Sequence, residues 1–264
     1  LPDGMYIPNR TVIYSSNEVS PNPGDTFTIS TYNGINPQEI NVTVDNQSLT
    51  LNLPGNNPLD IYYVNGSYTG TSNGTLENPF KTVKDAINYS NLFNLNATIY
   101  IMEGTYYDVN MTVANNLTIS AYEGANVILD GNKNGYIFYT NNSNNTFTII
   151  GLTLMNCTGY YYADESRGGA ILSYTNLTII NSTFKYNSAY LGGSIFNYAQ
   201  SNIINSTFNS NNANAGGAII SYGDLTIINS LFFNNSAYLV GAVGSLGYCN
   251  ISNSTFINNR ALNG

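Results

Sequence analysis

A repeat of 24 residues covers the last third of the chain and restricts what the chain can fold into. Phenylalanine, asparagine, alanine and glycine recur at this interval in one fixed phase, without insertion, between residues 168 and 264. The recurring positions are Phe184, Phe208, Phe232 and Phe256; Asn187, Asn211, Asn235 and Asn259; Ala189, Ala213, Ala237 and Ala261; and Gly169, Gly193, Gly217 and Gly241. A unit of this size cannot bury its own apolar face, so the period predicts stacked coils that pack on one another.

Each repeat is predicted to be built from strands. The first copy has short runs rich in β-branched or other apolar residues at 170–172, 177–180 and 183–184, separated by turn residues. None of these runs has the length or spacing of an amphipathic helix. Three short strands and three turns per coil indicate an all-β fold, a right-handed parallel β-helix.

Columns of identical residues should stack in register, because neighbouring coils lie about 4.8 Å apart. The columns that begin at Ile171 and Ile179 are expected to line the core. A second asparagine column also recurs in every copy, and it is predicted to form a buried amide ladder whose glycosylation sequons are inaccessible. This column consists of Asn181, Asn205, Asn229 and Asn253.

Two short elements of the repeat resemble those of known surface proteins. They are Gly-Gly-Ala-Ile, at 168–171, and Phe-x-x-Asn, at 184–187; Ser194 and Val240 depart from the first element in later copies. The pair resembles the repeats of chlamydial polymorphic outer-membrane proteins, and the asparagine-rich context is similar to adhesin-like surface proteins of methanogenic archaea. The resemblance implies a non-enzymatic adhesin or structural module, extracellular at the cell surface, whose partners are glycans or surface proteins of other cells.

Residues 1–57 are predicted to form a separate small β-rich unit. Strand-like runs occupy 11–14, 26–29 and 40–44, and 45–47 is typical of a hairpin turn before a further run at 48–51. A linker rich in proline and asparagine follows, so the β-helix is predicted to span 58–264. The chain begins with Leu1 and stops where the next Gly-Gly element would start, so we expect a β-helix truncated at its C-terminal end, a piece of a longer protein.

A helix at 77–87 is predicted to cap the N-terminal end of the coils. Phe80, Val83, Ala86 and Ile87 would share one face, and Pro79 suits a first turn. The end of a solenoid exposes unpaired backbone and apolar core that need a cover. The segment 74–82 also resembles the entry segment of many pectate-lyase-like β-helices.

Composition argues against several classes of function. Charged residues make up 8% of the chain, 7 basic against 15 acidic, which is the opposite of a nucleic-acid-binding footprint. Histidine is absent, which excludes a Ser-His-Asp triad and a histidine-ligated zinc site. The sequence contains no run of eighteen apolar residues, so it predicts no membrane-spanning segment. We therefore expect no cofactor, no metal and no nucleic-acid partner.

An insertion before the regular repeats is the first candidate site. Phe147 and its equivalent Leu177 are separated by 30 residues, so six extra residues lie within 158–167. The alternative is a solvated loop without function. The candidate binding residues of the insertion are Tyr160, Tyr161, Tyr162, Asp164, Glu165 and Arg167.

A tyrosine column is the second candidate. Tyr174, Tyr198 and Tyr222 recur at the repeat interval. Facing outward, they would form an aromatic strip for sugar rings or partner proteins; facing inward, they would be core. The alternation from Ile171 favours the outward orientation, but Leu172 has the same parity and is apolar, so both interpretations stay open.

A carbohydrate-active enzyme, a lyase or hydrolase of the pectate-lyase-like class, is the alternative function. Such enzymes place carboxylates on neighbouring coils to bind calcium or transfer protons. In the regular repeats Asp224 has Gln200 and Tyr248 as neighbours, so no carboxylate stack is expected there. The irregular coils supply the candidate acids Glu103, Asp108, Glu123, Asp130, Asp164 and Glu165.

Sequons and cysteines bear on the compartment. Exposed Asn-x-Ser/Thr sites, of which the chain has many, are typical of extracellular glycoproteins. Cys157 and Cys249 lie about four coils apart, roughly 19 Å at strand spacing, which is beyond disulfide reach. We expect both thiols to be unpaired.

Overall fold

The computed structural model describes residues 60–93, 95–162 and 165–263, together with four strands before residue 60. These four strands form two antiparallel pairs, β1 (Met5–Ile7) with β2 (Thr11–Ile13) and β3 (Thr26–Tyr32) with β4 (Pro37–Thr43). Strands near residues 11, 26 and 40 are therefore present as predicted. The hairpin predicted at 45–51 lies outside the described residues, and the unit boundary at residue 57 stays a prediction.

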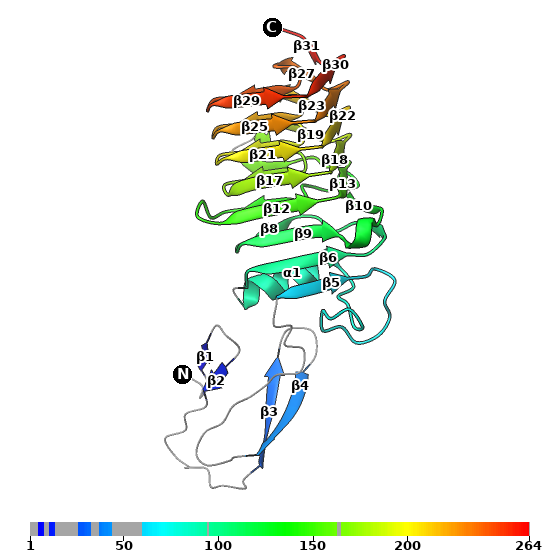
Figure 1. The fold of residues 1–264 in the computed structure, drawn as a ribbon, viewed down its shortest axis with the longest axis vertical. Coiled ribbons are helices and arrows are strands. Elements are labelled where there is room, and N and C mark those ends of the chain that lie inside the picture. Colours follow the sequence, from blue (N-terminus) through cyan, green and yellow to red (C-terminus); the bar gives the residue numbers. More distant parts are fainter. Residues whose placement is uncertain are drawn as a thin grey trace.

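The described chain from residue 60 onward winds into a parallel β-helix, which confirms the predicted fold class (Figure 1). Strands of successive coils pair in parallel and build four sheets, which we number I to IV in the order in which a regular coil visits them. Each coil of the regular repeat thus has four strands rather than the predicted three. The additional strand follows the turn at Asn187, where Ser-Ala-Tyr-Leu was too short and mixed to stand out as a strand.

The strands of sheets I and II form two adjoining walls. Sheet I contains β5 (Ile61–Val64), β6 (Ala97–Ile101), β9 (Leu117–Ala121), β12 (Thr146–Ile150), β17 (Asn176–Ile180), β21 (Ser201–Ile204), β25 (Leu225–Ile228) and β29 (Cys249–Ser252). Sheet II contains β7 (Gly104–Tyr106), β10 (Val127–Asp130), β13 (Leu152–Met155), β18 (Thr183–Lys185), β22 (Thr207–Asn209), β26 (Leu231–Phe233) and β30 (Thr255–Ile257). A 3-10 turn, η1 (Tyr122–Gly124), follows β9.

Sheet III begins later in the chain than the other sheets. It contains β14 (Tyr160–Tyr162), β15 (Glu165–Arg167), β19 (Ser188–Leu191), β23 (Asn212–Ala215), β27 (Ser236–Leu239) and β31 (Arg260–Ala261). Sheet IV contains β8 (Met111–Val113), β11 (Phe138–Thr140), β16 (Ile171–Ser173), β20 (Ile195–Asn197), β24 (Ile219–Ser221) and β28 (Val243–Ser245). The insertion at 158–167 therefore marks the place where a fourth sheet is added to the solenoid.

The phenylalanine column forms a stack in the core. Phe184, Phe208 and Phe232 are fully buried, and the rings from Phe184 to Phe256 stack with centroids 4.9, 4.7 and 4.7 Å apart. The ring planes are within 5° of parallel. The isoleucine columns that begin at Ile171 and Ile179 also line the core, as predicted.

The amide ladder lies at Asn187, Asn211 and Asn235, six residues after the predicted column. Asn211 Oδ1 accepts a hydrogen bond from the backbone N–H of Asn187 at 3.0 Å. Its Nδ2 donates to the carbonyl oxygen of Phe184 at 3.0 Å and to Asn235 Oδ1 at 2.9 Å. Each asparagine thereby binds the coil before it and the coil after it, while buried from water.

The prediction of a buried ladder at Asn181, Asn205, Asn229 and Asn253 is wrong. These four residues have φ between 49° and 52°, and their side chains are exposed. Asparagine tolerates this left-handed conformation better than most residues, and the corner turns its side chain outward. The sequons at Asn181 and Asn205 are consequently exposed, not buried. The residue after each corner faces inward instead, and Ser206 Oγ accepts from the backbone N–H of Ser182 at 3.2 Å.

The corner before sheet IV requires a left-handed residue too. Gly168, Gly192 and Gly216 have φ of 56°, 63° and 64°, and a Cβ on Gly168 would lie 1.9 Å from the carbonyl oxygen of Ile171. In the fourth copy Val240 occupies this corner with φ of 57°. A β-branched residue in this region is a conformational outlier.

Replacing Val240 with glycine is therefore expected to raise the free energy of unfolding. The left-handed conformation costs an L-residue about 1–2 kcal/mol, and the greater chain entropy of glycine offsets about 0.5–1 kcal/mol of this. We expect a net gain of about 1 kcal/mol, measured by urea denaturation. The matched control is Gly192→Val, which should destabilise the protein; a Val240→Gly variant that is less stable than the parent would contradict this explanation.

A capping helix is confirmed, but its predicted bounds are wrong. Helix α1 (Val83–Leu92) starts after Thr82, whose Oγ1 accepts a hydrogen bond from Asp85 N–H at 3.0 Å. Pro79 and Phe80 precede the helix because Phe80 pairs its backbone with Tyr63 and joins the core as an extended residue. Val83, Ala86 and Ile87 are buried, so the helix covers the first coils with its apolar face (Figure 1).

No helix among the described residues has the length and apolar character needed to cross a membrane.

Candidate functional site

The insertion at 158–167 folds into a hairpin that starts sheet III. Strands β14 and β15 are antiparallel, with Tyr161 opposite Ser166. Strand β15 then pairs in parallel with β19 through Arg167 and Leu191. The hairpin thus carries residues of the insertion onto the same sheet as the regular repeats.

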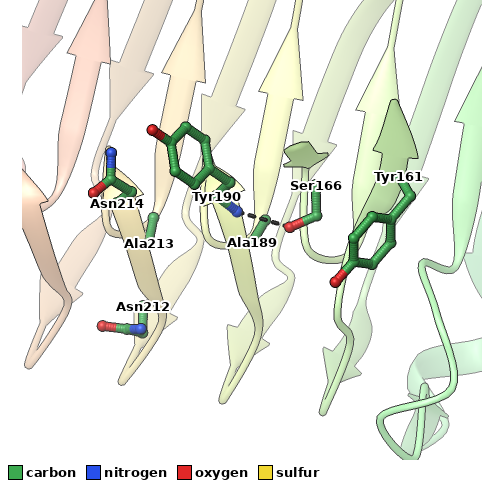
Figure 2. A pocket seen from close by; sticks show the side chains of 7 residues that line it. All are labelled: Tyr161, Ser166, Ala189, Tyr190, Asn212, Ala213 and Asn214. Atoms are coloured by element: carbon green, nitrogen blue, oxygen red, sulfur yellow. Dashed lines mark hydrogen bonds between the residues drawn. The ribbon is translucent and has the colours of Figure 1, made fainter. Parts of the chain in front are cut away.

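A hollow of about 400 Å³ lies on sheet III (Figure 2). It is open to solvent, because Tyr161 is 75% exposed and Tyr190 is 43% exposed. Two of the lining residues, Ala189 and Ala213, have small side chains that leave space unfilled. The hollow is lined by Tyr161, Ser166, Ala189, Tyr190, Asn212, Ala213 and Asn214.

The two tyrosines flank a polar centre. Figure 2 shows Tyr161 and Tyr190 on either side of Ser166, and each ring turns a face to the viewer. Ser166 Oγ accepts a hydrogen bond from the backbone N–H of Tyr190 at 2.8 Å, which fixes the serine between the rings. Asn212 and Asn214 extend the polar surface on the far side of Tyr190.

This arrangement has the chemistry of a site for neutral polar rings. Aromatic side chains combine a broad apolar face with a hydroxyl tip, and amides offer both donors and acceptors. None of the residues that line the hollow is charged. The hollow can therefore stack against the C–H face of a sugar and hydrogen bond to its hydroxyl groups.

The predicted tyrosine column has a different environment. Leu172, Phe196 and Ile220 form a second buried cluster, separate from the main core, and Tyr174 and Tyr198 pack against it. The rings of Tyr174 and Tyr198 stack at 4.3 Å and 15°. Burial, followed by hydrogen bonding to Tyr198, raises the pKa of Tyr174 to about 12. The phenol therefore stays neutral throughout the physiological range of pH.

The column is neither core nor a free platform. Tyr222, which is 45% exposed, presents the most accessible ring, whereas Tyr174 and Tyr198 are partly buried. The outward orientation considered from the sequence fits Tyr222, whereas Tyr174 and Tyr198 lie between the outward and the inward orientation. The binding role of the column stays a prediction.

The remaining residues of the insertion divide between two places. Tyr160 stacks on Tyr139 at 5.0 Å, and Arg167 Nη1 donates to the hydroxyl of Tyr198 at 2.5 Å. Glu165 lies 3.8 Å from the Arg167 guanidinium. The bond from Arg167 to Tyr198 attaches the hairpin to the tyrosine column, while Tyr161 reaches the hollow. The side chain of Tyr162 and all of Asp164 lie outside the described residues.

Among the candidate acids of the irregular coils, Asp108 and Asp130 accept hydrogen bonds within the fold, whereas Glu103 and Glu123 are exposed. Asp108 Oδ2 accepts a hydrogen bond from the backbone N–H of Val83 at the start of α1, and burial raises the pKa of this carboxyl. Asp130 Oδ1 accepts from the N–H of Asn132 at 2.8 Å and from Asn156 Nδ2 at 3.0 Å. Within the described ranges no three acidic or cysteine side chains are grouped to hold a metal ion. Cys157 and Cys249 are both free thiols.

Sequence reasoning missed Tyr190, Asn212 and Asn214. The available signal was Ser-Ala-Tyr-Leu, which occurs at 188–191 and again at 236–239, directly after the ladder asparagine. Ser and Tyr carry hydroxyl groups and alternate with the apolar Ala and Leu, which is the pattern of a half-exposed strand. Four residues were too few to recognise as a separate sheet.

No protein-family model matches the sequence, and no curated protein matches it. A solved structure titled "Rhamnogalacturonan lyase" is similar over 76% of this chain and 69% of its own length, with 12% sequence identity and a TM-score of 0.41. The parallel β-helix itself is established by the strand pairing described above.

Proposed function

We propose that this chain is a non-enzymatic binding module of an extracellular cell-surface protein and that the hollow on sheet III holds carbohydrate. The observation that carries the proposal is the pair Tyr161 and Tyr190 around an uncharged, hydroxyl- and amide-lined surface. In this role the protein is an adhesin, and its partners are glycans on other cells.

The scaffold supports this proposal because it holds the site rigidly. Tyr190 and Asn214 project from strands whose coils are joined by the phenylalanine stack and the amide ladder. A site whose side chains are fixed before binding loses less conformational entropy when the ligand arrives. A rigid wall of repeated strands therefore suits recognition of an extended surface.

The exposed corners support an extracellular setting. Asn181 and Asn205 are exposed and each is followed by Ser-Thr, so both are acceptor sequons at the surface. An accessible sequon is compatible with glycosylation in a secretory compartment. The adhesin proposal predicts a chain that tolerates glycans on this side of the solenoid.

Tyr190→Ala is expected to weaken glycan binding about tenfold or more, since the stacking of one aromatic ring contributes up to about 1.5 kcal/mol beyond the area it buries. Ligands are first found on an array of neutral and acidic glycans, and affinities are then measured by calorimetry. Tyr107→Ala is the matched control, because Tyr107 is 64% exposed on β-helix surface away from the hollow. Equal loss of affinity in both variants would contradict the proposed site.

The absence of enzymatic activity is tested separately, by looking for cleavage products. Incubation of the parent protein with polygalacturonate and other acidic glycans, with and without calcium, should yield no new reducing ends and no unsaturated products. A product that disappears in Glu165→Gln or Asp130→Asn would replace the binding module with the carbohydrate-active enzyme.

A further inference from the structure

Tyrosine alternates with a small polar residue across five consecutive strands of sheet III. Tyr161 lies opposite Ser166, Ser166 lies beside Tyr190, and the parallel register continues from Tyr190 to Asn214 and Tyr238. Residues that pair directly across strands project from the same face of a sheet. The face therefore carries one row in the order Tyr, Ser, Tyr, Asn, Tyr.

All three tyrosines of this row are accessible. Tyr161, Tyr190 and Tyr238 are 75%, 43% and 50% exposed. Tyr238 is held in place at the far end, where its hydroxyl accepts a hydrogen bond from Asn263 Nδ2 at 3.1 Å. The three tyrosines together with Ser166 and Asn214 are called the sheet III row below.

The spacing of the row is regular and runs along the solenoid axis. Adjacent strands lie about 4.8 Å apart, so successive tyrosines are about 10 Å apart. This is too far for the rings to stack on one another, which leaves each ring face free. Ser166 and Asn214 stand in the gaps and offer hydrogen-bonding groups between the rings.

We infer that the sheet III row binds a linear, uncharged polysaccharide that lies along the solenoid axis and stacks every second sugar ring on a tyrosine. An extended chain with equatorial linkages repeats after two sugar rings, over a length comparable to the two-strand spacing, and its alternate rings turn the same face to one side. The intervening rings place their hydroxyl groups over Ser166 and Asn214. No position of the row is charged, which favours a neutral polymer over an acidic one. This inference rests on the proposed function and specifies its ligand class.

The test is the affinity for a disaccharide, a tetrasaccharide and a hexasaccharide of β-1,4-linked glucose, with β-1,4-linked N-acetylglucosamine oligomers as a second series. In the parent protein each lengthening that reaches another tyrosine should raise affinity about tenfold. Curved α-1,4-linked glucose oligomers of equal length are the control, and they should gain little from length.

Two tyrosine variants separate a row from a single subsite. A tetrasaccharide reaches two tyrosines, so Tyr190→Ala should lower its affinity about tenfold, whereas Tyr238→Ala leaves the Tyr161 and Tyr190 pair intact and should lower it about twofold at most. For the hexasaccharide both variants should lose about tenfold. Circular dichroism confirms that each variant is folded.

Asn214→Tyr tests the spacing. A ring at this position would fill the gap between Tyr190 and Tyr238 and remove the amide over which an intervening sugar ring places its hydroxyl groups. Hexasaccharide affinity should fall although aromatic area increases; a rise would overturn the inference. Binding without dependence on length would also overturn it and leave the proposed function standing. Absence of any binding to these or other glycans would overturn both.

Discussion

Phe208→Ala is expected to lower the free energy of unfolding by about 3–5 kcal/mol, the usual cost of deleting a buried phenylalanine ring. Phe208 is completely buried and stacks on Phe184 below and Phe232 above, at 4.9 and 4.7 Å. The coils on either side are fixed by their strand pairing, so the cavity cannot close readily. Urea denaturation followed by circular dichroism provides the measurement.

The control for this variant lies in the same column. Phe256 stacks on Phe232 but is 41% exposed. Phe256→Ala removes the same atoms and leaves much less of a cavity, so its cost should be less than half as large. Equal effects of the two variants would mean that the column does not pack as a buried stack.

Asn211→Ala is expected to have an effect comparable to that of Phe208→Ala. The substitution leaves the N–H of Asn187 and the carbonyl of Phe184 without their side-chain partner in the interior, and each unpaired buried group costs about 1–3 kcal/mol. Asn205→Ala, in the neighbouring corner, should cost no more than about 1 kcal/mol, because only a left-handed preference is lost. A larger loss of unfolding free energy in Asn205→Ala than in Asn211→Ala would contradict the assignment of Asn211 to the buried ladder and of Asn205 to the exposed corner.

The 24-residue repeat predicted the architecture because a fixed period determines which residues lie above one another in stacked coils. Residues that recur every 24 positions must superpose when strands stack, and Ile179 and Phe184 lie in the core columns that this rule requires. The capping helix was predicted from the face shared by Val83, Ala86 and Ile87. Its start was wrong because the side-chain pattern does not show that Phe80 forms a backbone pair with Tyr63.

The two asparagine columns show where sequence reasoning stops. Asn181 and Asn187 both recur in every coil, and the same amide suits a left-handed corner and a buried ladder. Periodicity cannot separate them, because it is identical for both. What separates them is the direction in which the backbone turns, and that depends on neighbouring coils.

The candidate site was predictable only in part. The insertion was found because it breaks the period, and it does bring Tyr161 to the hollow. Tyr190 and Tyr238 were not recognised, since their column reads Tyr, Asn, Tyr and its apolar character changes from coil to coil. The change between tyrosine and asparagine along this column gives the sheet III row its spacing. Its regularity can be recognised only when the strands are placed side by side.

The ladders between coils carry no charge. Stacked phenyl rings, asparagine amides and serine hydroxyls join one coil to the next, as in Phe208, Asn211 and Ser206. Dissolved ions screen interactions between charges over a Debye length but act little on buried neutral contacts. The cohesion of the solenoid should thus be nearly independent of ionic strength, so that the same rigid wall persists from fresh water to brine.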